Sequence, residues 1–325
     1  MPLETIYQGI QDDLLKVEDG LSQVCKTDFT WLSEVLSFAL KAGGKRIRPA
    51  LVMLSGKFYD YDMKRLLPMA LSVELMHTAT LVHDDAIDKS FVRRSRPTIN
   101  KLWGEEKAVL LGDYLFAKAG EAVTETKTLR VVMLFSQTLE IISAGELNQA
   151  LNSFNIDQTY DDYLQRIRGK TASLFALSTQ SGAILSHASP KVVQAFKRYG
   201  DDLGIAFQII DDLLDFIGTE EELGKPVGSD LVQGTLTLPA MMIMKLYPRD
   251  NPIKTVFGGK LTKEEKQENV RKAVEIVRNS KIVEMCFDAA TDYCKQACAD
   301  IALLPDTPTH RALVELTEYV IKRRK

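Results

Sequence analysis

Apolar residues return every three or four positions along most of this chain, which is the spacing of an amphipathic helix. In segment 29–40 the apolar positions include Trp31, Leu32, Val35, Leu36 and Leu40. Segments 161–185 and 192–218 show the same spacing, and no two segments alternate apolar and polar residues as paired strands would. Good helix formers are plentiful. The pattern therefore predicts an all-α fold with many helices around one core.

The helical pattern is interrupted in a few places, none of which has the composition of a domain linker. The interruptions are Gly43–Gly44, Arg96–Pro97, Ser189–Pro190, Gly218–Gly234 and Tyr247–Gly259. The chain has 325 residues, which is long for one domain but within the range of large single domains. With 45% apolar residues it can bury a sizeable core. We therefore expect a single all-α domain over residues 1–325.

Charge and apolar runs narrow the choice of partners and compartment. The net charge is −3, which gives no overall field to attract nucleic acid. Residues 1–16 contain acidic side chains and no long apolar run, unlike a signal peptide. No segment approaches the roughly 20 apolar residues that span a bilayer. We therefore expect a cytoplasmic protein that does not bind nucleic acid.

The cysteines agree with that compartment. The chain has four of them, Cys25, Cys286, Cys294 and Cys298, without the spacing of a disulfide framework. A metal site at Cys294 and Cys298 would need further ligands, and only His310 is near in sequence. Reduced thiols are therefore expected.

Two groups of aspartates stand directly after apolar helical segments. The first is Asp84, Asp85 and Asp88, and the second, with the same D-D-x-x-D spacing, is Asp211, Asp212 and Asp215. One group alone is as easily a solvated helix end, but two copies favour a shared role. Carboxylates this close repel one another in a low dielectric unless cations lie among them, and oxygen ligands suit Mg²⁺. The repeat predicts an Mg²⁺–phosphate site between two facing helices.

Basic residues lie beside glycine bends and beside these aspartates. They are Lys45, Arg46 and Arg48 after a Gly-Gly bend, Arg93 and Arg94 after the first aspartates, Lys170, and Lys225 in a glycine-bounded loop. Any one of them alone is more simply a surface charge, but their shared placement suits phosphate binding. His77 lies seven residues before Asp84, two helical turns along the same face. On spacing alone, a histidine there is more often a core residue.

Together these segments resemble the trans-isoprenyl diphosphate synthase family over nearly the whole chain. In the family's order they are GGKRIRP, HDDAID, RRSRPT, GDYLF, GEL, GKT, AFQIIDDLLD and GKPVGSDL. A single DDxxD would be a weak signal, whereas the ordered set is very specific. The resemblance implies an all-helical bundle around a deep central cavity. It also implies a prenyltransferase that joins isopentenyl diphosphate head to tail, repeatedly, to an allylic diphosphate.

The resemblance also implies roles for individual residues. Those that resemble the Mg²⁺ ligands are Asp84, Asp88 and Asp211, with Asp85, Asp212 and Asp215 nearby or bound through water. Those that resemble the grip on the allylic diphosphate are Arg93, Lys170 and Lys225. Those that resemble the isopentenyl diphosphate pocket are Lys45, Arg48, His77 and Arg94. Thr171 and Gln208 resemble the polar groups that face the allylic carbocation. The family implies three Mg²⁺ ions with substrates bound, replaceable by Mn²⁺, a homodimer, and transient membrane contact for product release.

The residue types suit this chemistry. Breaking an allylic C–O bond leaves a carbocation and a highly charged diphosphate, which metal ions, arginine and lysine stabilise. Residues 218–234 have the composition of a lid, and the final YVIKRRK resembles a basic tail that closes over the site. Thr235 stands where many members carry lysine, so diphosphate binding there is expected to be weaker or differently organised.

In this family the helix before the first aspartates sets the product length. An aromatic residue five positions before the first aspartate stops growth early, but here that residue is Ala79, followed by Thr80. The next layer is expected to include Leu75, Met76, Phe135 and Ile142. A helix of about 20 residues spans about 30 Å, enough for a long tunnel. We therefore expect a hexaprenyl to nonaprenyl product, suited to a quinone side chain.

Other functions fit the sequence less well. A class I terpene cyclase shares the fold, but its second metal motif usually carries Asn, Ser and Glu, whereas this chain has DDLLD. A non-catalytic partner subunit of a heteromeric synthase would typically lack one intact aspartate group. A short-chain farnesyl or geranylgeranyl diphosphate synthase remains an alternative for product length. A helical scaffold with acidic patches leaves the ordered basic segments unexplained.

Overall fold

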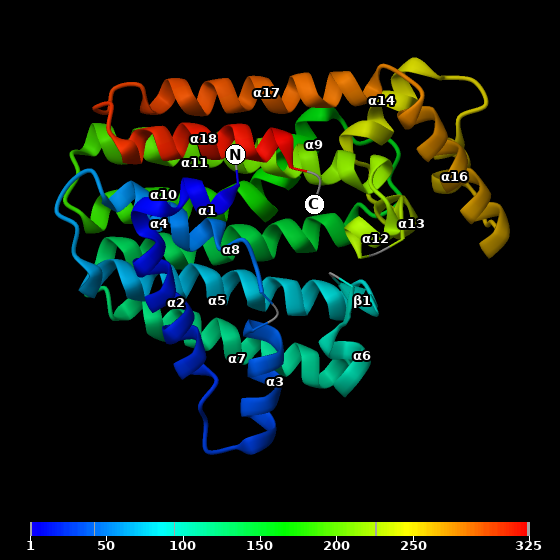
Figure 1. Cartoon of the computed structure of the whole chain (residues 1–325). Coiled ribbons are helices and arrows are strands. Elements are labelled where there is room, and N and C mark those ends of the chain that lie inside the picture. Colours follow the sequence, from blue (N-terminus) through cyan, green and yellow to red (C-terminus); the bar gives the residue numbers. More distant parts are fainter. Residues whose placement is uncertain (1, 42, 94, 225, 324–325) are drawn as a thin grey trace.

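Helices make up almost all of the regular structure in the computed structural model, which describes residues 2–41, 43–93, 95–224 and 226–323 (Figure 1). The elements up to residue 151 are α1 (Leu3–Ile6), η1 (Gln8–Ile10), α2 (Gln11–Val24), α3 (Thr30–Leu40), α4 (Ile47–Gly56), α5 (Met63–Ile87), β1 (Val92–Arg93), β2 (Arg96–Pro97), α6 (Ile99–Trp103), α7 (Glu105–Thr124) and α8 (Leu129–Leu151). The later elements are α9 (Tyr160–Ile167), the π-helical turn η2 (Arg168–Ala172), α10 (Ser173–Leu185), α11 (Pro190–Ile217), α12 (Glu220–Leu223), α13 (Ser229–Gln233), α14 (Leu238–Leu246), α15 (Pro252–Gly258), α16 (Lys263–Arg278), α17 (Ile282–Ile301) and α18 (Pro308–Lys322).

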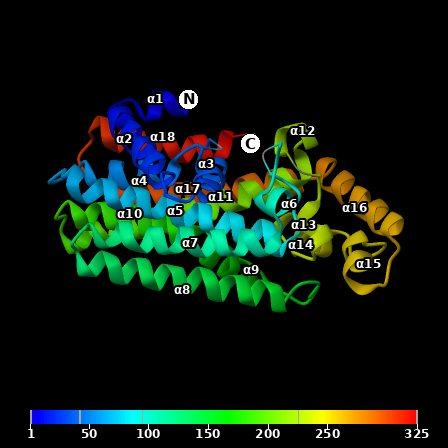
Figure 2. The same cartoon turned by 90° about the horizontal axis from the view of Figure 1, so that it is seen from below.

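The long helices lie side by side in layers. In Figure 1, α5, α8, α11, α17 and α18 run in nearly the same direction, while α16 projects at one end. Seen from below, α8 and α7 form one side of the bundle and the short α1 packs beside α18 on the other (Figure 2). One contiguous apolar core includes residues from α1 through α18. This core supports our proposal that residues 1–325 form one domain.

The helix boundaries follow the interruptions in the sequence pattern. Helix α11 begins with Pro190 in its first turn and ends just before Gly218. Helix α5 begins after Asp62, whose side chain accepts a hydrogen bond from the Lys64 amide and so satisfies one free N–H of the first turn. The sequence pattern did not predict the small antiparallel pair β1–β2, in which Val92 lies opposite Pro97. Two residues per strand are too few to show an alternating pattern.

A close contact between helices positions the interior of the bundle. Gly204 of α11 lies against η2, where a Cβ atom added to it would be 2.5 Å from the Cα of Ala172. Only glycine allows this approach, since real Cβ atoms essentially never come so near another carbon. The contact brings η2 against the middle of α11, about two turns before the second aspartate group.

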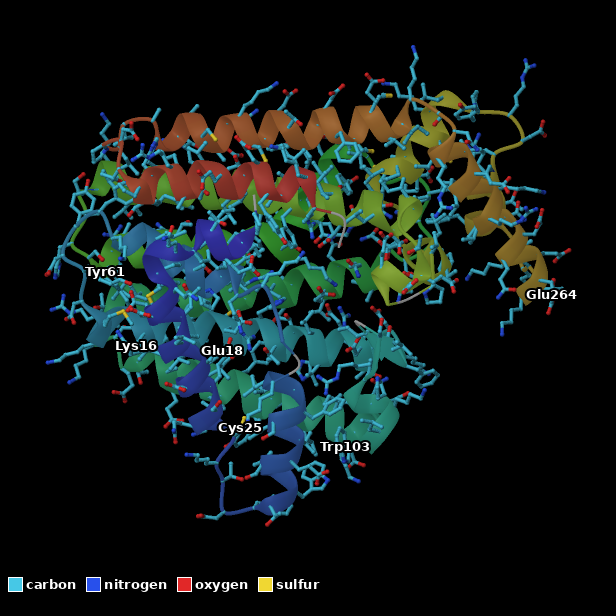
Figure 3. The ribbon with its side chains drawn as sticks, viewed as in Figure 1. Lys16, Glu18, Cys25, Tyr61, Trp103 and Glu264 are labelled. Atoms are coloured by element: carbon cyan, nitrogen blue, oxygen red, sulfur yellow. The ribbon has the colours of Figure 1, made fainter. Side chains whose placement is uncertain are left out.

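Arg46 holds the loop before α4 in an unusual conformation. Its φ is 48°, in the left-handed region that non-glycine residues seldom adopt. The guanidinium is paired with Glu74 of α5, at 2.6 Å, and with Glu18 of α2, which Figure 3 labels. It also donates to the Leu40 carbonyl at 3.0 Å. Arg46, which the sequence grouped with candidate phosphate ligands, is therefore committed to a structural ion-pair network.

Two further findings concern membrane-spanning helices and the cysteines. In the described part of the chain, no helix is both long and apolar enough to cross a bilayer. All four cysteines are free thiols, three of them buried. Cys294 and Cys298 both contact Thr317 of α18, through its carbonyl at 3.6 Å and its hydroxyl at 3.4 Å.

Candidate active site

The first aspartate group lies at the C-terminal end of α5. Asp85 is buried and accepts a hydrogen bond from Nε of Arg93 at 2.8 Å. Arg93 lies on β1, so the small β1–β2 pair turns the chain back and brings this arginine to the aspartates. Asp88 caps α5, and its amide donates to the Asp84 carbonyl at 2.8 Å. The structure thus places Arg93 directly beside the first group, as the sequence predicted.

Lys170 of η2 joins the first aspartates to α8. Its Nζ lies 3.3 Å from Oδ2 of Asp84 and 2.7 Å from Oε1 of Glu146. Burial alone would lower the pKa of Lys170, but the Asp84 and Glu146 carboxylates overcome this and raise it. Burial also raises the pKa of Glu146, which Lys170 opposes and Asp84 reinforces. The lysine is therefore held charged between two carboxylates.

The second aspartate group divides into one accessible and two buried carboxylates. The side chain of Asp211 is 41% exposed and forms an ion pair with Arg323, just after α18, at 2.7 Å. Asp212 and Asp215 are 3% and 1% exposed. Asp211 is thus the accessible member of this group, whereas Asp212 and Asp215 are occupied with internal hydrogen bonds.

A chain of hydrogen bonds runs through Asp212. The Thr171 hydroxyl donates to Oε1 of Gln208 at 2.6 Å, and Nε2 of Gln208 donates to Oδ1 of Asp212 at 2.8 Å. The Tyr163 hydroxyl donates to the other oxygen of Asp212 at 2.8 Å. Burial, reinforced by repulsion from Asp230, raises the pKa of Asp212 to about 7. The network fixes the orientation of the Gln208 amide and brings Thr171 and Gln208 together.

Asp215 organises the glycine-rich segment that follows α11. Its carboxylate accepts from the Ser229 hydroxyl at 2.8 Å and from the Asp230 amide at 3.2 Å. Its carbonyl accepts from the Gly228 amide at 2.8 Å. Thr235, at the position where the resemblance would place a lysine, donates its amide to the Asp230 carbonyl at 2.8 Å. The candidate lid, residues 218–234, is thus tied to the base of the second aspartate group.

Adjacent residues of η2 connect the two aspartate groups, because Lys170 pairs with Asp84 and Thr171 is linked through Gln208 to Asp212. Burial raises the pKa of Asp88, Lys170 opposes this shift, and Asp84 and Asp230 add to it. Asp230 also repels Asp212. One carboxylate of the glycine-rich segment therefore interacts with both α5 and α11. The Mg²⁺–phosphate site between these two helices stays a prediction.

Of the candidate residues for isopentenyl diphosphate, His77 lies on α5, Arg48 in the first turn of α4 and Lys45 just before α4, and these two helices pack against each other. The Lys45 ammonium lies 5.5 Å from the ring centre of Tyr319, and its carbonyl accepts from the Tyr7 hydroxyl at 3.1 Å. The Arg48 guanidinium lies 4.9 Å from the ring centre of Phe175. His77 is half-buried on α5, where its carbonyl accepts from the Thr80 hydroxyl at 2.7 Å. The assignment of this group to a substrate stays a prediction.

The remaining candidate residues lie outside the described part of the chain or in its interior. Arg94 and Lys225 lie outside the described residues, as do the last two residues of the predicted basic tail. The candidate chain-length residues are in the interior: Leu75, Met76, Ala79, Phe135 and Ile142 are buried, and Thr80 is half-buried.

The carboxylates fit Mg²⁺ only in company with a ligand. Among the described residues, no group of three or more His, Cys, Asp or Glu side chains is close enough to hold a metal ion. Asp84 and Asp88, four positions apart at the end of α5, and Asp211 on α11 offer carboxylate oxygens from two helices. Mg²⁺ is usually bound by one or two carboxylates, several waters and substrate phosphates. The donor set therefore suits Mg²⁺ that binds with a diphosphate.

Comparison with known proteins agrees with this geometry. Residues 29–277 match the family described as polyprenyl synthetase. The chain belongs to this family. It is 37% identical over 324 residues to heptaprenyl diphosphate synthase component 2 of Bacillus subtilis, covering 100% of this chain and 92% of the relative. It is also 37% identical, over 92% of each chain, to a geranylgeranyl diphosphate synthase of Saccharolobus solfataricus.

A solved structure confirms the fold class. A polyprenyl synthase of Caulobacter crescentus, in complex with calcium and isoprenyl diphosphate, superposes with a TM-score of 0.94 at 30% identity. The match covers 100% of this chain and 98% of the other. The family resemblance and the all-α bundle of polyprenyl synthases, both expected from the sequence segments, are therefore confirmed.

Sequence reasoning missed several residues that the structure brings into the site. They are Glu146, Tyr163 and Asp230, whereas Arg323 was expected only as part of the basic tail YVIKRRK, without a named partner. Glu146 lies in the GEL segment, so a signal for it existed. Tyr163 and Arg323 act over large separations along the chain, which local spacing does not reveal.

Proposed function

We propose that this chain is a trans-polyprenyl diphosphate synthase that joins isopentenyl diphosphate head to tail to an allylic diphosphate. The observation that carries the proposal is that η2 connects the two aspartate groups: Lys170 pairs with Asp84, beside the Asp85–Arg93 pair, and Thr171 is linked through Gln208 to Asp212. Opposed carboxylates and cations at one place suit a metal-bound diphosphate. Membership of the polyprenyl synthetase family supports the same reaction.

The residues divide between the two substrates. We assign Arg93, Lys170 and Lys225 to the allylic diphosphate, and Lys45, Arg48, His77 and Arg94 to isopentenyl diphosphate. Asp84, Asp88 and Asp211 are the proposed ligands of Mg²⁺, or of Mn²⁺ in its place, with three ions when substrates are bound. The bound metal supplies positive charge that stabilises the departing diphosphate.

Thr171 and Gln208 are suited to the carbocation half of the reaction. Their oxygens are joined by the 2.6 Å hydrogen bond, which leaves lone pairs available to a positive centre. Because Asp212 fixes the Gln208 amide, its carbonyl oxygen is preorganised and does not need to turn as charge develops. No protein nucleophile is required.

We further propose a long product, hexaprenyl to nonaprenyl. Ala79 is fully buried in α5 and is small, and Leu75 and Met76 lie buried one turn further from the aspartates. The heptaprenyl name of one relative supports this length, whereas the geranylgeranyl name of another, at the same identity, keeps a short product as the alternative.

The active unit is proposed to contain more than one chain. Several large apolar side chains along α8 are exposed, among them Leu129, Met133, Ile141, Leu147 and Leu151. Contact with a second copy would remove this surface from water. The relative in Bacillus subtilis is named as a component, which makes a different partner chain the alternative. The particle mass of the purified chain, measured by light scattering together with its activity, separates these cases.

A cytoplasmic location is proposed on the basis of four free thiols, which suit a reducing compartment. A long prenyl product is strongly apolar, so transient contact with a membrane at product release is proposed with it.

The decisive experiment follows release of inorganic diphosphate by the purified chain with Mg²⁺. We expect release only when isopentenyl diphosphate and an allylic diphosphate are both present. Release from the allylic substrate alone would instead indicate a cyclase. No release under any combination, with the chain shown to be folded, would indicate a non-catalytic or partner-dependent subunit.

A further inference from the structure

The last described residue of the chain, Arg323, reaches into the second aspartate group. One of its guanidinium nitrogens, Nη2, lies 2.7 Å from Oδ1 of Asp211 and donates to the Phe207 carbonyl at 2.6 Å. The guanidinium also stacks 3.7 Å from the ring centre of Phe207. Its side chain is only 3% exposed, although it stands at the end of the chain. A protein cation thus lies against the proposed metal ligand of α11.

This contact is incompletely satisfied. Nε of Arg323 is buried and has no hydrogen-bond partner among the described residues. A buried donor without a partner carries a desolvation cost that the bond to Asp211 must offset. Asp211 itself is 41% exposed, which weakens the ion pair by solvent screening. The contact therefore holds Arg323 in place, but it contributes little net free energy.

Movement at this end does not require the helix to leave the bundle. Leu313, Leu316 and Val320 of α18 are fully buried, whereas Lys322 is exposed. The Arg323 amide donates to the backbone carbonyl of Tyr319 at 3.0 Å, and the ring of Tyr319 lies against Lys45, one of the candidate residues for isopentenyl diphosphate. The end of α18 therefore contacts both halves of the candidate site.

We propose that Arg323 is a place-holding cation, which neutralises Asp211 until a divalent metal arrives and must then release it. A metal ion at Oδ1 of Asp211 competes with the guanidinium for the same oxygen and the same negative charge, so each weakens the binding of the other. The displaced Arg323 takes the end of the chain with it, which couples metal binding to movement at the mouth of the site. This inference rests on the proposed role of Asp211 as a metal ligand.

The test measures Mn²⁺ binding to the full chain in the presence of inorganic diphosphate, by electron paramagnetic resonance. In Arg323→Ala, Asp211 loses its internal competitor, so we expect Mn²⁺ to bind about fivefold more tightly than in the wild type, the scale of a partly exposed ion pair. Arg323→Lys retains the charge and is expected to give a smaller gain. Lys322→Ala removes a neighbouring exposed charge without touching Asp211, and should leave the affinity unchanged.

A second readout follows the chain end directly. Hydrogen exchange of residues 318–323 in the wild type should become faster when Mn²⁺ is added, because Arg323 is released from Asp211. Equal or weaker Mn²⁺ binding in Arg323→Ala, or exchange that does not change with metal, would overturn the proposal. Asp211→Ala distinguishes the proposed metal-ligand role of Asp211 from the proposed role of Arg323. If Asp211→Ala leaves Mn²⁺ binding intact, Asp211 is not a metal ligand and both proposals fail. If Asp211→Ala abolishes Mn²⁺ binding while Arg323→Ala has no effect, Asp211 is a metal ligand and only the proposed role of Arg323 fails.

Discussion

Lys170 and Glu146 form an ion pair at 2.7 Å across the interface between η2 and α8. The same ammonium lies 3.3 Å from Asp84, so Glu146 holds it at the edge of the first aspartate group. If a metal takes Asp84, Glu146 remains to keep Lys170 in place for a diphosphate. Glu146 is in this sense a positioning residue, acting through the lysine.

Glu146→Gln should therefore weaken the grip on the allylic substrate. The amide keeps the shape of the carboxylate but loses the charge that anchors Lys170, and a charge-assisted hydrogen bond is worth about 1.5–3 kcal/mol. We expect kcat/KM for the allylic diphosphate to fall about tenfold, mainly through KM. Glu140→Gln, an exposed change on the same helix, is the control. Equal kinetics in the two variants would show that the ion pair is not needed.

The two aspartate groups should both be needed for turnover. Asp84→Ala or Asp211→Ala removes a carboxylate that anchors positive charge at the departing diphosphate. The loss in kcat is expected to be at least about a hundredfold, the scale of losing a main electrostatic stabiliser. Asp12→Ala, on the exposed face of α2, should keep full activity. Full wild-type activity in excess chelator would refute the metal requirement.

The contact of Gly204 with η2 predicts a large effect from one methyl group. Gly204→Ala places a Cβ atom 2.5 Å from Ala172 Cα, so α11 and η2 must separate and Thr171 must move from Gln208. We expect the free energy of unfolding to fall by about 1–3 kcal/mol and activity to fall with it. Gly120→Ala on α7, where an added Cβ meets nothing, should be neutral or stabilising. Urea unfolding of both variants makes the comparison.

Much of the site could be predicted from local spacing because its residues come in short segments. The D-D-x-x-D repeat identified both helices, and Thr171 and Gln208, assigned to one half of the reaction, do lie together. Local spacing could not show which carboxylates face a ligand. Asp211 and Asp212 are adjacent in sequence, yet one is accessible and the other is buried against Tyr163, 49 positions away.

Contacts with residues distant in sequence also determine the roles of the basic residues. Arg46 and Arg48 are two positions apart and look alike in sequence, but Arg46 is used by Glu18 and Glu74 to hold the loop before α4. Those partners lie on α2 and α5, so only the packed structure reveals them. The strand pair β1–β2 was missed for a different reason, since two-residue strands carry no periodic signal.

Asp202 and Asp300, away from the candidate site, should make the free energy of unfolding depend on pH. Burial raises the pKa of Asp202 to about 7, with Asp300 and Asp201 adding to the shift. The folded state thus favours the protonated form, so stability is lost as the pH rises from about 4 to about 7. Asp202→Asn mimics the protonated form. It should raise the melting temperature relative to wild type clearly at pH 8 and much less at pH 5. A difference that does not depend on pH would contradict this.

Ala79 should control product length. Ala79→Tyr introduces a large ring at a fully buried position of α5, which is expected to fill the proposed tunnel. Products should shorten to farnesyl or geranylgeranyl diphosphate, while the first condensation continues at a similar rate. Phe135→Ala, which removes a buried ring from α8, should lengthen products if that ring forms part of the floor. Chromatography of the dephosphorylated products gives the answer, and an unchanged distribution in Ala79→Tyr would refute this account of the tunnel.

The central claim is tested most directly by sizing what the purified chain makes on its own. The chain is incubated with Mg²⁺, labelled isopentenyl diphosphate and farnesyl diphosphate, and the products are separated by length. Our account predicts a ladder of all-trans products that ends between hexaprenyl and nonaprenyl, and no incorporation without the allylic starter. Absence of labelled product from the folded chain, or a single product at geranylgeranyl length, would contradict it.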